Sequence, residues 1–289
     1  MNTTSISKQS NGATWLAHLA GGTTLHDWPA VRVADGTLAG TAARFIAVVP
    51  DPDNRFTRAR TGEVGLVEGW QLAQAVQETI HADRDAAHKR PIVAVIDVTS
   101  QAYGRREEAF GIHQALAGAA GAYAQARLAG HPVIGLIVGL AMSGAFLAHG
   151  YQANRLIALA DPGVMVHAMG KASAARITLR SVEALEALAQ SVPPMAYDID
   201  SYASLGLLWK VLRPSSAAAP TADDVALVRA TLEAALADIA ADDAANDGSN
   251  ASRDLSGRFG GEHRAASRRV RQLLGEQWNM GERQGGEPT

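Results

Sequence analysis

Apolar residues along this chain form two kinds of pattern, short unbroken runs and longer stretches with helical spacing. Unbroken runs predict buried strands, and they cover residues 31–33, 44–49, 92–98, 132–138, 155–159 and 164–167. Helical spacing is clearest from Val64 to about Arg84 and from Glu107 to about Ala129, where Gly130 is the expected C-cap. Strands and helices that alternate in this order predict an α/β fold around a largely parallel sheet.

The remainder of the chain is expected to form helices joined by linkers. Helices are predicted at 181–190, 197–211, 221–241 and 263–278, and the composition of 214–220 and 242–261 is typical of linkers. The polar first residues carry no periodic pattern. We therefore expect a disordered N-terminus at 1–13, one domain at 14–213, and a C-terminal helical extension at 214–289 with a flexible linker near 242–261.

A cluster of small residues follows the predicted strand at 132–138. Gly139, Ala141, Ser143 and Gly144 lie between this strand and a short segment that can form a helix. Backbone N–H groups at the start of a helix have no partner within it, and the helix dipole favours negative charge there. With little side-chain bulk nearby, an oxygen that develops negative charge can bind these N–H groups. The pattern predicts an oxyanion hole, although close packing between a strand and a helix also requires small residues.

A polar loop, TSQAYGRR, follows the other central strand at 92–98. It contains Ser100, Gln101, Tyr103 and Arg105. Because ligands bind at the carboxyl ends of parallel strands, this loop and the turn around Gly139 are expected to meet. Two loops that each contribute an N–H can hold a thioester carbonyl as it becomes an enolate.

The composition narrows the chemistry further. The chain has 289 residues, 47% of them hydrophobic, and its formal net charge of −3 gives no nucleic-acid signal. It has no cysteine, which excludes disulfides, thiolate catalysis and Cys-ligated metal clusters. No apolar run reaches the length of a membrane span, and no pair of His with carboxylates has ligand spacing. We expect a cytoplasmic protein without a metal ion and without membrane or nucleic-acid partners.

Three sequence blocks carry a resemblance to a known family. They are IDVTSQAYGRREEAFGIHQAL at 96–116, HPVIGLIVGLAMSGAFLAHGYQANRLIAL at 131–159 and VMVHAMGKASAARI at 164–177. Together they resemble the gamma subunit of biotin-independent malonate decarboxylase, in the carboxyltransferase branch of the ClpP/crotonase-like superfamily. The resemblance covers roughly residues 30–215. It implies a crotonase-like spiral of ββα units with additional C-terminal helices.

The resemblance also implies a reaction and its partners. A subunit of this kind acts with a homologous beta subunit on a malonyl thioester, which the prosthetic group of a separate acyl-carrier subunit carries. Loss of CO2 leaves the enolate of the acetyl thioester, and no cofactor is expected in this chain. In related biotin carboxyltransferases the corresponding turn is a Gly-Gly-Ser-Gly-Gly run around the biotin ureido oxygen. Here Leu140, Ala141 and Met142 replace its glycines, which fits a site that holds no biotin.

The residue pattern and the resemblance together suggest a set of site residues. The catalytic candidates belong to the two loops and are Gly139, Ala141, Met142, Ser143, Gly144, Ser100, Gln101 and Tyr103. The candidates for substrate binding are Arg105, His167 and Gly170. Tyr103 equally fits a loop aromatic that covers the end of the sheet, and Arg105 fits local ion pairing with Glu107 or Glu108.

Three other functions fit parts of the pattern. Clp-type proteases hold their nucleophile in a G-x-A-x-S turn, so Ser143 and His167 would form a hydrolase pair. The register of GLAMSGAFL also allows Met142 at the nucleophile position, and no orienting carboxylate is evident. A stand-alone acyl-CoA hydratase or isomerase would need an acid near the turns, where Glu107 and Glu108 are the available ones. The third alternative is a non-catalytic structural subunit of a carboxyltransferase-like complex.

Overall fold

A seven-stranded sheet forms the centre of the fold in the computed structural model, which describes residues 10–21, 24–245, 255, 258 and 260–284. The strands are β1 (Val31–Leu38), β2 (Thr41–Val48), β3 (Ile92–Val98), β4 (Val133–Met142), β5 (Arg155–Leu159), β6 (Met165–His167) and β7 (Lys210–Leu212). The strand order is β1-β2-β3-β4-β5-β7, and β6 pairs with the end of β4. Only β1 and β2 run antiparallel to each other. The expected α/β architecture with a largely parallel sheet is confirmed.

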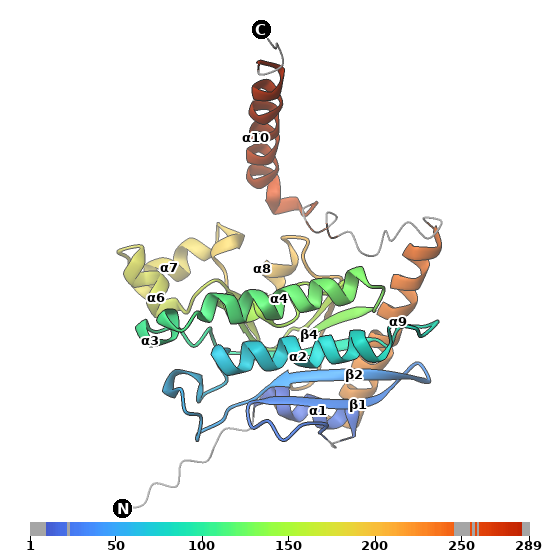
Figure 1. Ribbon diagram of the computed structural model, residues 1–289. Coiled ribbons are helices and arrows are strands. Elements are labelled where there is room, and N and C mark those ends of the chain that lie inside the picture. Colours follow the sequence, from blue (N-terminus) through green and yellow to red (C-terminus); the bar gives the residue numbers. More distant parts are fainter. Residues whose placement is uncertain (1–9, 22–23, 246–254, 256–257, 259, 285–289) are drawn as a thin grey trace, which may run out of the picture.

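Helices connect these strands and cover the sheet (Figure 1). They are α1 (Asn11–Ala20), α2 (Leu66–Ala82), α3 (Arg105–Ala109), α4 (Ile112–Leu128), α5 (Ser143–Ala148), α6 (Lys171–Ile177), α7 (Val182–Ala189), α8 (Ile199–Ala203), α9 (Ala222–Ala245) and α10 (Ala265–Gln284). Short 3₁₀ turns occur at Thr57–Ala59, Pro193–Met195 and Glu262–Arg264. Among the helices described, none has the length and apolar character needed to cross a lipid bilayer.

Helices α2 and α4 lie side by side, and small residues set how closely they approach (Figure 1). A Cβ atom on Gly69 of α2 would lie 2.8 Å from the carbonyl carbon and oxygen of Ala115 in α4. A Cβ on Gly118 would similarly lie 2.9 Å from the ring of Trp70. The Ala-rich composition of α4 therefore has a packing reason, since bulkier residues would separate the two helices.

Helices α1 and α9 belong to the same hydrophobic core as the strands. Trp15 of α1 is fully buried, and its indole Nε1–H donates to the carbonyl of Ala217 at 2.8 Å. Residues spaced along one face of α9 are buried in that core, namely Val228, Leu232, Ala235 and Ile239. The helix that the sequence assigned to a separate extension thus contributes to the core of the main domain.

Several predicted strand and helix ends need correction. The segment 34–42, which separates the predicted strands at 31–33 and 44–49, is mostly strand itself. The turn contains only Ala39 and Gly40, both with positive φ. Strand β4 continues past Val138 to Met142, because β6 and β3 still pair with it there. Helix α1 begins at Asn11, inside the segment 1–13 that was expected to be disordered, while residues 1–9 lie outside the described residues.

The predicted helices and the predicted linker also need correction. The predicted helix 107–129 is divided into α3 and α4 at Gly111, whose φ of 84° is left-handed. The predicted helix 197–211 is wrong, because only Ile199–Ala203 is helical and Lys210–Leu212 pairs with β5 as β7. Helix α9 extends through residues 242–245, part of the expected linker, and 246–254 lie outside the described residues. Helix α10 begins at Ala265 and ends at Gln284, beyond the predicted end at Trp278.

A buried histidine links α5 to the sheet and to α4. His149 is fully buried, and its Nε2–H donates to the Val95 carbonyl at 3.1 Å. The Tyr123 hydroxyl donates to its Nδ1 at 3.0 Å. Burial lowers the pKa of His149 to about 4, because a charged imidazolium would lose its hydration there. The imidazole is therefore neutral in the folded protein at neutral pH.

This histidine predicts a loss of stability in acid. The unfolded chain binds a proton at His149 near pH 6.5, and the folded chain does so only near pH 4. The contribution of His149 to the free energy of unfolding is therefore constant above pH 6.5 and falls as pH decreases between these two values. The full effect is about 3 kcal/mol. Urea denaturation at several pH values should show a smaller fall for His149→Gln than for the wild type. Equal pH dependence of both proteins would contradict this assignment.

The core position of α9 predicts the cost of truncating its buried side chains. Leu232→Ala should lower the free energy of unfolding by about 2–5 kcal/mol, because a fully buried leucine leaves a cavity. Leu227→Ala on the exposed side of the same helix is the control and should change it by less than about 0.5 kcal/mol. Tryptophan fluorescence in urea measures both, since Trp15 reports on the core. A Leu232→Ala protein as stable as the control would show that α9 folds separately from the sheet.

Candidate active site

Strands β3 and β4 pair regularly until Ile96, and then the register shifts. Ile96 pairs with Ile137, but Val98 pairs with Ala141, so β4 bulges at Gly139 and Leu140. Asp97 lies opposite this bulge, and its Oδ1 accepts a hydrogen bond from the Leu140 N–H at 3.0 Å. The bulge redirects the end of β4, which is a common use of bulges next to functional sites.

Asp97 also explains why residue 139 is a glycine. A Cβ at Gly139 would lie 2.1 Å from Asp97 Oδ1, so any larger residue would displace the carboxylate. The other oxygen, Oδ2, accepts from the Gly12 N–H of α1 at 3.2 Å. Asn11 of the same helix donates to the Val138 carbonyl at 2.7 Å. Gly139 therefore has a packing role around Asp97, and the prediction that it belongs to the oxyanion hole gains no support from its position.

The chain turns sharply between β4 and α5. Met142 is still extended, with φ −112° and ψ 136°, whereas Ser143 has a φ of 62°. A left-handed conformation is unfavourable for a residue with a Cβ, and such strain is retained mainly where the surrounding structure requires it. The turn places Ser143 and Gly144 directly after the central strand, where an anion-binding turn was expected.

The loop after β3 and the turn after β4 do meet, as the sequence predicted. The Gly144 N–H donates to Gln101 Oε1 at 2.6 Å, and a Cβ at Gly144 would lie 2.7 Å from the same oxygen. Gln101 was expected to supply a donor, but here its side chain is the acceptor for the predicted donor of the other loop. The side-chain oxygen Oε1 of Gln101 occupies the position next to the Gly144 N–H that an oxyanion would take.

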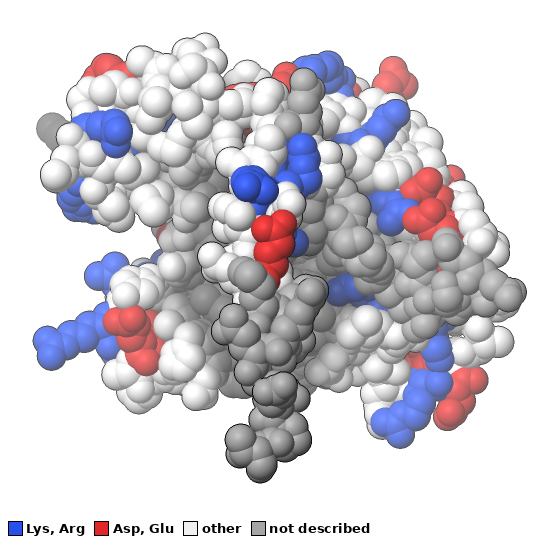
Figure 2. Space-filling view, turned by 90° about the horizontal axis from the view of Figure 1, so that it is seen from above, with Lys and Arg blue, Asp and Glu red and all other residues white. Residues whose placement is uncertain are grey.

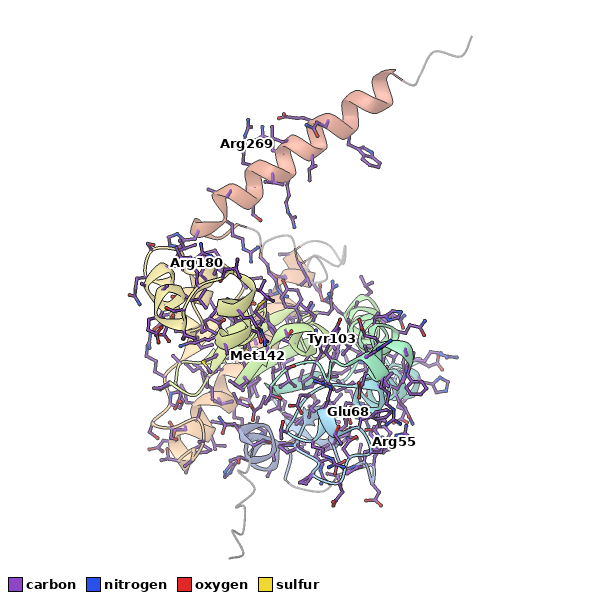
Figure 3. The ribbon with its side chains drawn as sticks, turned by 90° about the vertical axis from the view of Figure 1, so that its left-hand side faces the viewer. Arg55, Glu68, Tyr103, Met142, Arg180 and Arg269 are labelled. Atoms are coloured by element: carbon purple, nitrogen blue, oxygen red, sulfur yellow. The ribbon has the colours of Figure 1, made fainter. Side chains whose placement is uncertain are left out.

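The other residues of the first loop lie at the rim of this junction. An isolated β-bridge between Val64 and Gln101 fixes the loop. The Ser100 hydroxyl donates to the backbone carbonyl of Gln101 at 2.6 Å. Tyr103 is 53% exposed and its hydroxyl donates to Glu108 Oε1 at 2.8 Å, a bond that raises the pKa of Tyr103. In Figure 3, Tyr103 and Met142 are near the centre of this end of the molecule. Arg105 is exposed, and within the described part of the chain it forms no ion pair with Glu107 or Glu108.

His167 enters the site through strand β6, where it pairs in register with Met142. Its ring stacks on Tyr197 with a centroid distance of 3.9 Å and an interplanar angle of 11°. Its Nδ1 lies 3.0 Å from the Met169 carbonyl oxygen and 3.2 Å from the Met169 amide nitrogen. Partial burial lowers the pKa of His167, while the backbone bond to Met169 opposes that shift.

A cavity of about 530 Å³ brings part of the predicted site together. Its wall consists of Ser143, Gly144, Phe146, Leu147, Tyr151, Val166, His167, Ala168, Pro193, Pro194, Met195, Ala196, Tyr202, Leu205 and Leu207. The wall is mostly apolar, so charge inside it depends strongly on the few polar groups present. Seen from above, the molecule has a deep notch at its left-hand edge, the side where Figure 1 places α3, α6 and α7 (Figure 2).

The remaining predicted residues do not line this cavity. Ala141 is a buried strand residue that pairs with Val98 and Val166, so it is not part of a turn. Met142 packs in a separate small core with Ala174, Leu185 and Tyr197. Gly170 precedes α6, where a Cβ would meet no atom within 4 Å. Ser143, Gly144 and His167 are therefore the predicted residues that share one space.

Sequence reasoning missed Asp97 and the residues that cover the cavity. Asp97 had a visible signal, since it is the charged residue of the apolar run IVAVIDV. Tyr202 and Pro193–Met195 gave no signal, because they lie within or just before the predicted helix 197–211 and reach the cavity only through the tertiary fold. No cluster of three or more potential metal ligands occurs within the described ranges.

Comparison with known proteins identifies the family. The sequence model of the malonate decarboxylase gamma subunit (MdcE) family matches residues 59–278. The chain is 38% identical over 157 residues to the malonyl-S-ACP:biotin-protein carboxyltransferase MADD of Malonomonas rubra. This match covers 53% of the chain and 54% of MADD, so the chain spans about half the length of that curated relative.

Solved structures agree with this match in sequence and in fold. A chain of a Pseudomonas malonate decarboxylase hetero-tetramer in complex with coenzyme A is 63% identical, with a TM-score of 0.84, and a chain of the Pseudomonas MdcD-MdcE hetero-dimer is also 63% identical, with a TM-score of 0.82. Each match covers 93% of this chain and 100% of the other. Transcarboxylase 12S, at 19% identity, has a TM-score of 0.60 over 81% of this chain and 42% of that one. This likeness shows a shared fold alone, and it confirms the predicted fold class. The chain belongs to the malonate decarboxylase gamma subunit family.

Proposed function

We propose that this chain is one subunit of a malonate decarboxylase and that it acts with a homologous beta subunit on a malonyl thioester. The observation that carries this proposal is the 63% identity to the Pseudomonas MdcD-MdcE hetero-dimer chain, along its full length. The thioester is held by the prosthetic group of a separate acyl-carrier subunit, and this chain supplies no cofactor of its own. The reaction is the loss of CO2, which makes the complex a carboxy-lyase.

The exposed side of α10 supports the need for a partner. Val270, Leu274 and Trp278 are 54%, 60% and 72% exposed although they are large apolar residues. An apolar surface of this kind is stabilised when another protein covers it. In Figure 1 the helix projects away from the sheet, in a position suited to contact a second subunit.

The mechanism follows from the cavity and its backbone donor. The bond between the α-carbon and the carboxylate breaks, CO2 leaves, and the electron pair forms an enolate of the acetyl thioester. The enolate oxygen takes the Gly144 N–H once Gln101 Oε1 has moved away from it. The wall of the cavity is mostly apolar, so this hydrogen bond is worth more there than it would be in solution.

The hydrolase alternative lacks its supporting geometry in the described part of the chain. No hydrogen bond joins Ser143 to His167, and His167 Nδ1 faces the Met169 backbone where a serine hydrolase has an orienting carboxylate. A stand-alone hydratase or isomerase and a non-catalytic subunit are the remaining alternatives. The first would be active without a partner subunit, and variants at Gly144 distinguish the second from the proposed function.

Gly144→Val in the reconstituted complex should lower the turnover number for CO2 release by roughly 10²–10³, because the added bulk fills the space from which an oxygen would approach the N–H, with the same effect as losing one oxyanion donor. The new side chain would displace the flexible end of Gln101 rather than backbone, so the chain should still fold and assemble. Gly121→Val is the control, because a Cβ there meets no atom within 4 Å. Full activity of the Gly144→Val complex would favour a structural role for this subunit, and CO2 release by the chain alone would contradict the shared site.

Gln101→Glu tests whether the Gly144 donor must be released. A carboxylate at this position would hold the N–H more tightly and repel the enolate, so activity at neutral pH should fall roughly tenfold. Gln101→Met has similar length without the acceptor oxygen and should retain activity. CO2 release by both reconstituted complexes is the measurement. If the glutamate variant is as active as the methionine variant, the enolate does not use this N–H.

A further inference from the structure

The proposed reaction leaves one step without a residue. After CO2 is lost, the α-carbon of the enolate must receive a proton to become the methyl group of the acetyl thioester. The backbone amide that binds the oxygen does not give up its proton at neutral pH. A side chain that titrates near neutral pH and lies in the same cavity is suited to this step.

Among the described residues of the cavity wall, three side chains other than the very weakly acidic Ser143 hydroxyl can carry a dissociable proton. They are Tyr151, Tyr202 and His167. Burial raises the pKa of Tyr202 further above its usual range, so its proton is held too tightly for the role. The Tyr151 ring lies against the Arg258 guanidinium, 5.8 Å from its centre, and against Phe146. The imidazole of His167 is the group whose ordinary pKa is closest to neutral.

The geometry of His167 allows it to gain and lose a proton without moving. The stack on Tyr197 and the register with Met142 fix the ring. Its Nδ1 lies within hydrogen-bond distance of both the carbonyl and the N–H of Met169. The carbonyl accepts when Nδ1 is protonated, and the N–H donates when it is not. Its Nε2 makes no hydrogen bond to any described residue. The described buried atoms that lack a hydrogen-bond partner do not include it, so Nε2 is accessible.

We propose, on the basis of the function proposed above, that His167 is the acid that protonates the enolate. The proton moves from Nε2 to the α-carbon, the enolate electron pair forms the new C–H bond, and the imidazole becomes neutral. Water then returns a proton to Nε2. One proton is consumed for each CO2 released, which balances the conversion of a malonyl carboxylate into an acetyl methyl group.

The surroundings of His167 fix the direction of its pH dependence. Strand β4 carries no titratable group against it, and Tyr197 contributes a neutral ring. Charged groups on the other neighbouring elements are engaged with one another: Lys171 with Glu186, Asp200 with Arg213, and Asp198 with Ser201. Burial therefore keeps free His167 neutral, and an anionic malonyl group raises its pKa on binding. Because the acid must be protonated, kcat/KM falls as pH rises above its pKa.

The reverse proton transfer gives the sharpest test. In D2O, the wild-type complex should exchange the α-protons of an acetyl thioester of the acyl carrier for deuterium, with neutral His167 as the base, and mass spectrometry follows this exchange. His167→Asn keeps a donor for the Met169 carbonyl but cannot transfer the proton, and it should slow exchange by about 10² or more. It should also abolish the decline of kcat/KM that accompanies the deprotonation of free His167 as pH rises. Imidazole added to His167→Ala should restore part of the exchange.

The controls separate this proposal from the function on which it rests. His113→Asn, on the exposed side of α4, should exchange deuterium like the wild type. Exchange at the wild-type rate in an intact His167→Asn complex would overturn the role of His167. The decarboxylase function would still be supported if the wild-type complex releases CO2. Absence of CO2 release from the wild-type complex would instead overturn the proposed function itself. Loss of exchange in His167→Ala with no rescue by imidazole would show that the ring acts only in packing.

Discussion

The carboxylate of Asp97 determines the geometry at the end of the central strands. Its two oxygens bind the N–H groups of Gly12 and Leu140, which belong to α1 and to the bulge of β4. This carboxylate is only partly buried, and its two backbone partners connect the N-terminal helix to the bulge, while Gly139 leaves room for it. Together with the pairing of β3 and β6, this contact holds the end of β4 in the shifted register from which the turn at Ser143 and Gly144 begins.

The candidate site combines segments that are far apart in the sequence. The loop after β3 supplies Gln101, the turn after β4 supplies Gly144, and β6 supplies His167. The covering residues come from the segment around Pro193–Met195 and from α8. The parallel sheet explains this convergence, because the carboxyl ends of β3, β4 and β6 reach the same edge. The chemistry therefore depends on topology more than on any local motif.

The sequence was sufficient for features that depend on local pattern. Strands β3 and β5 were predicted with their observed ends, and the meeting of the two loops followed from their place after parallel strands. Local pattern failed where tertiary contacts decide. A register shift opposite Asp97 extended β4, and pairing with β5 made Lys210–Leu212 a strand within an apolar stretch that resembles a helix. The acceptor role of Gln101 was also beyond prediction, since it depends on side-chain direction.

The contact between Gln101 and Gly144 has a consequence for selectivity. A ligand oxygen reaches the N–H only in the fraction of molecules in which the glutamine has turned away, and its apparent affinity is reduced by that fraction. A small anion that binds through this single N–H has little other binding energy with which to displace the glutamine. Under the proposed function, a thioester on a long carrier arm would make further contacts whose binding energy can displace the glutamine. In the proposed mechanism, each anion must therefore compete with the Gln101 side chain for the Gly144 N–H.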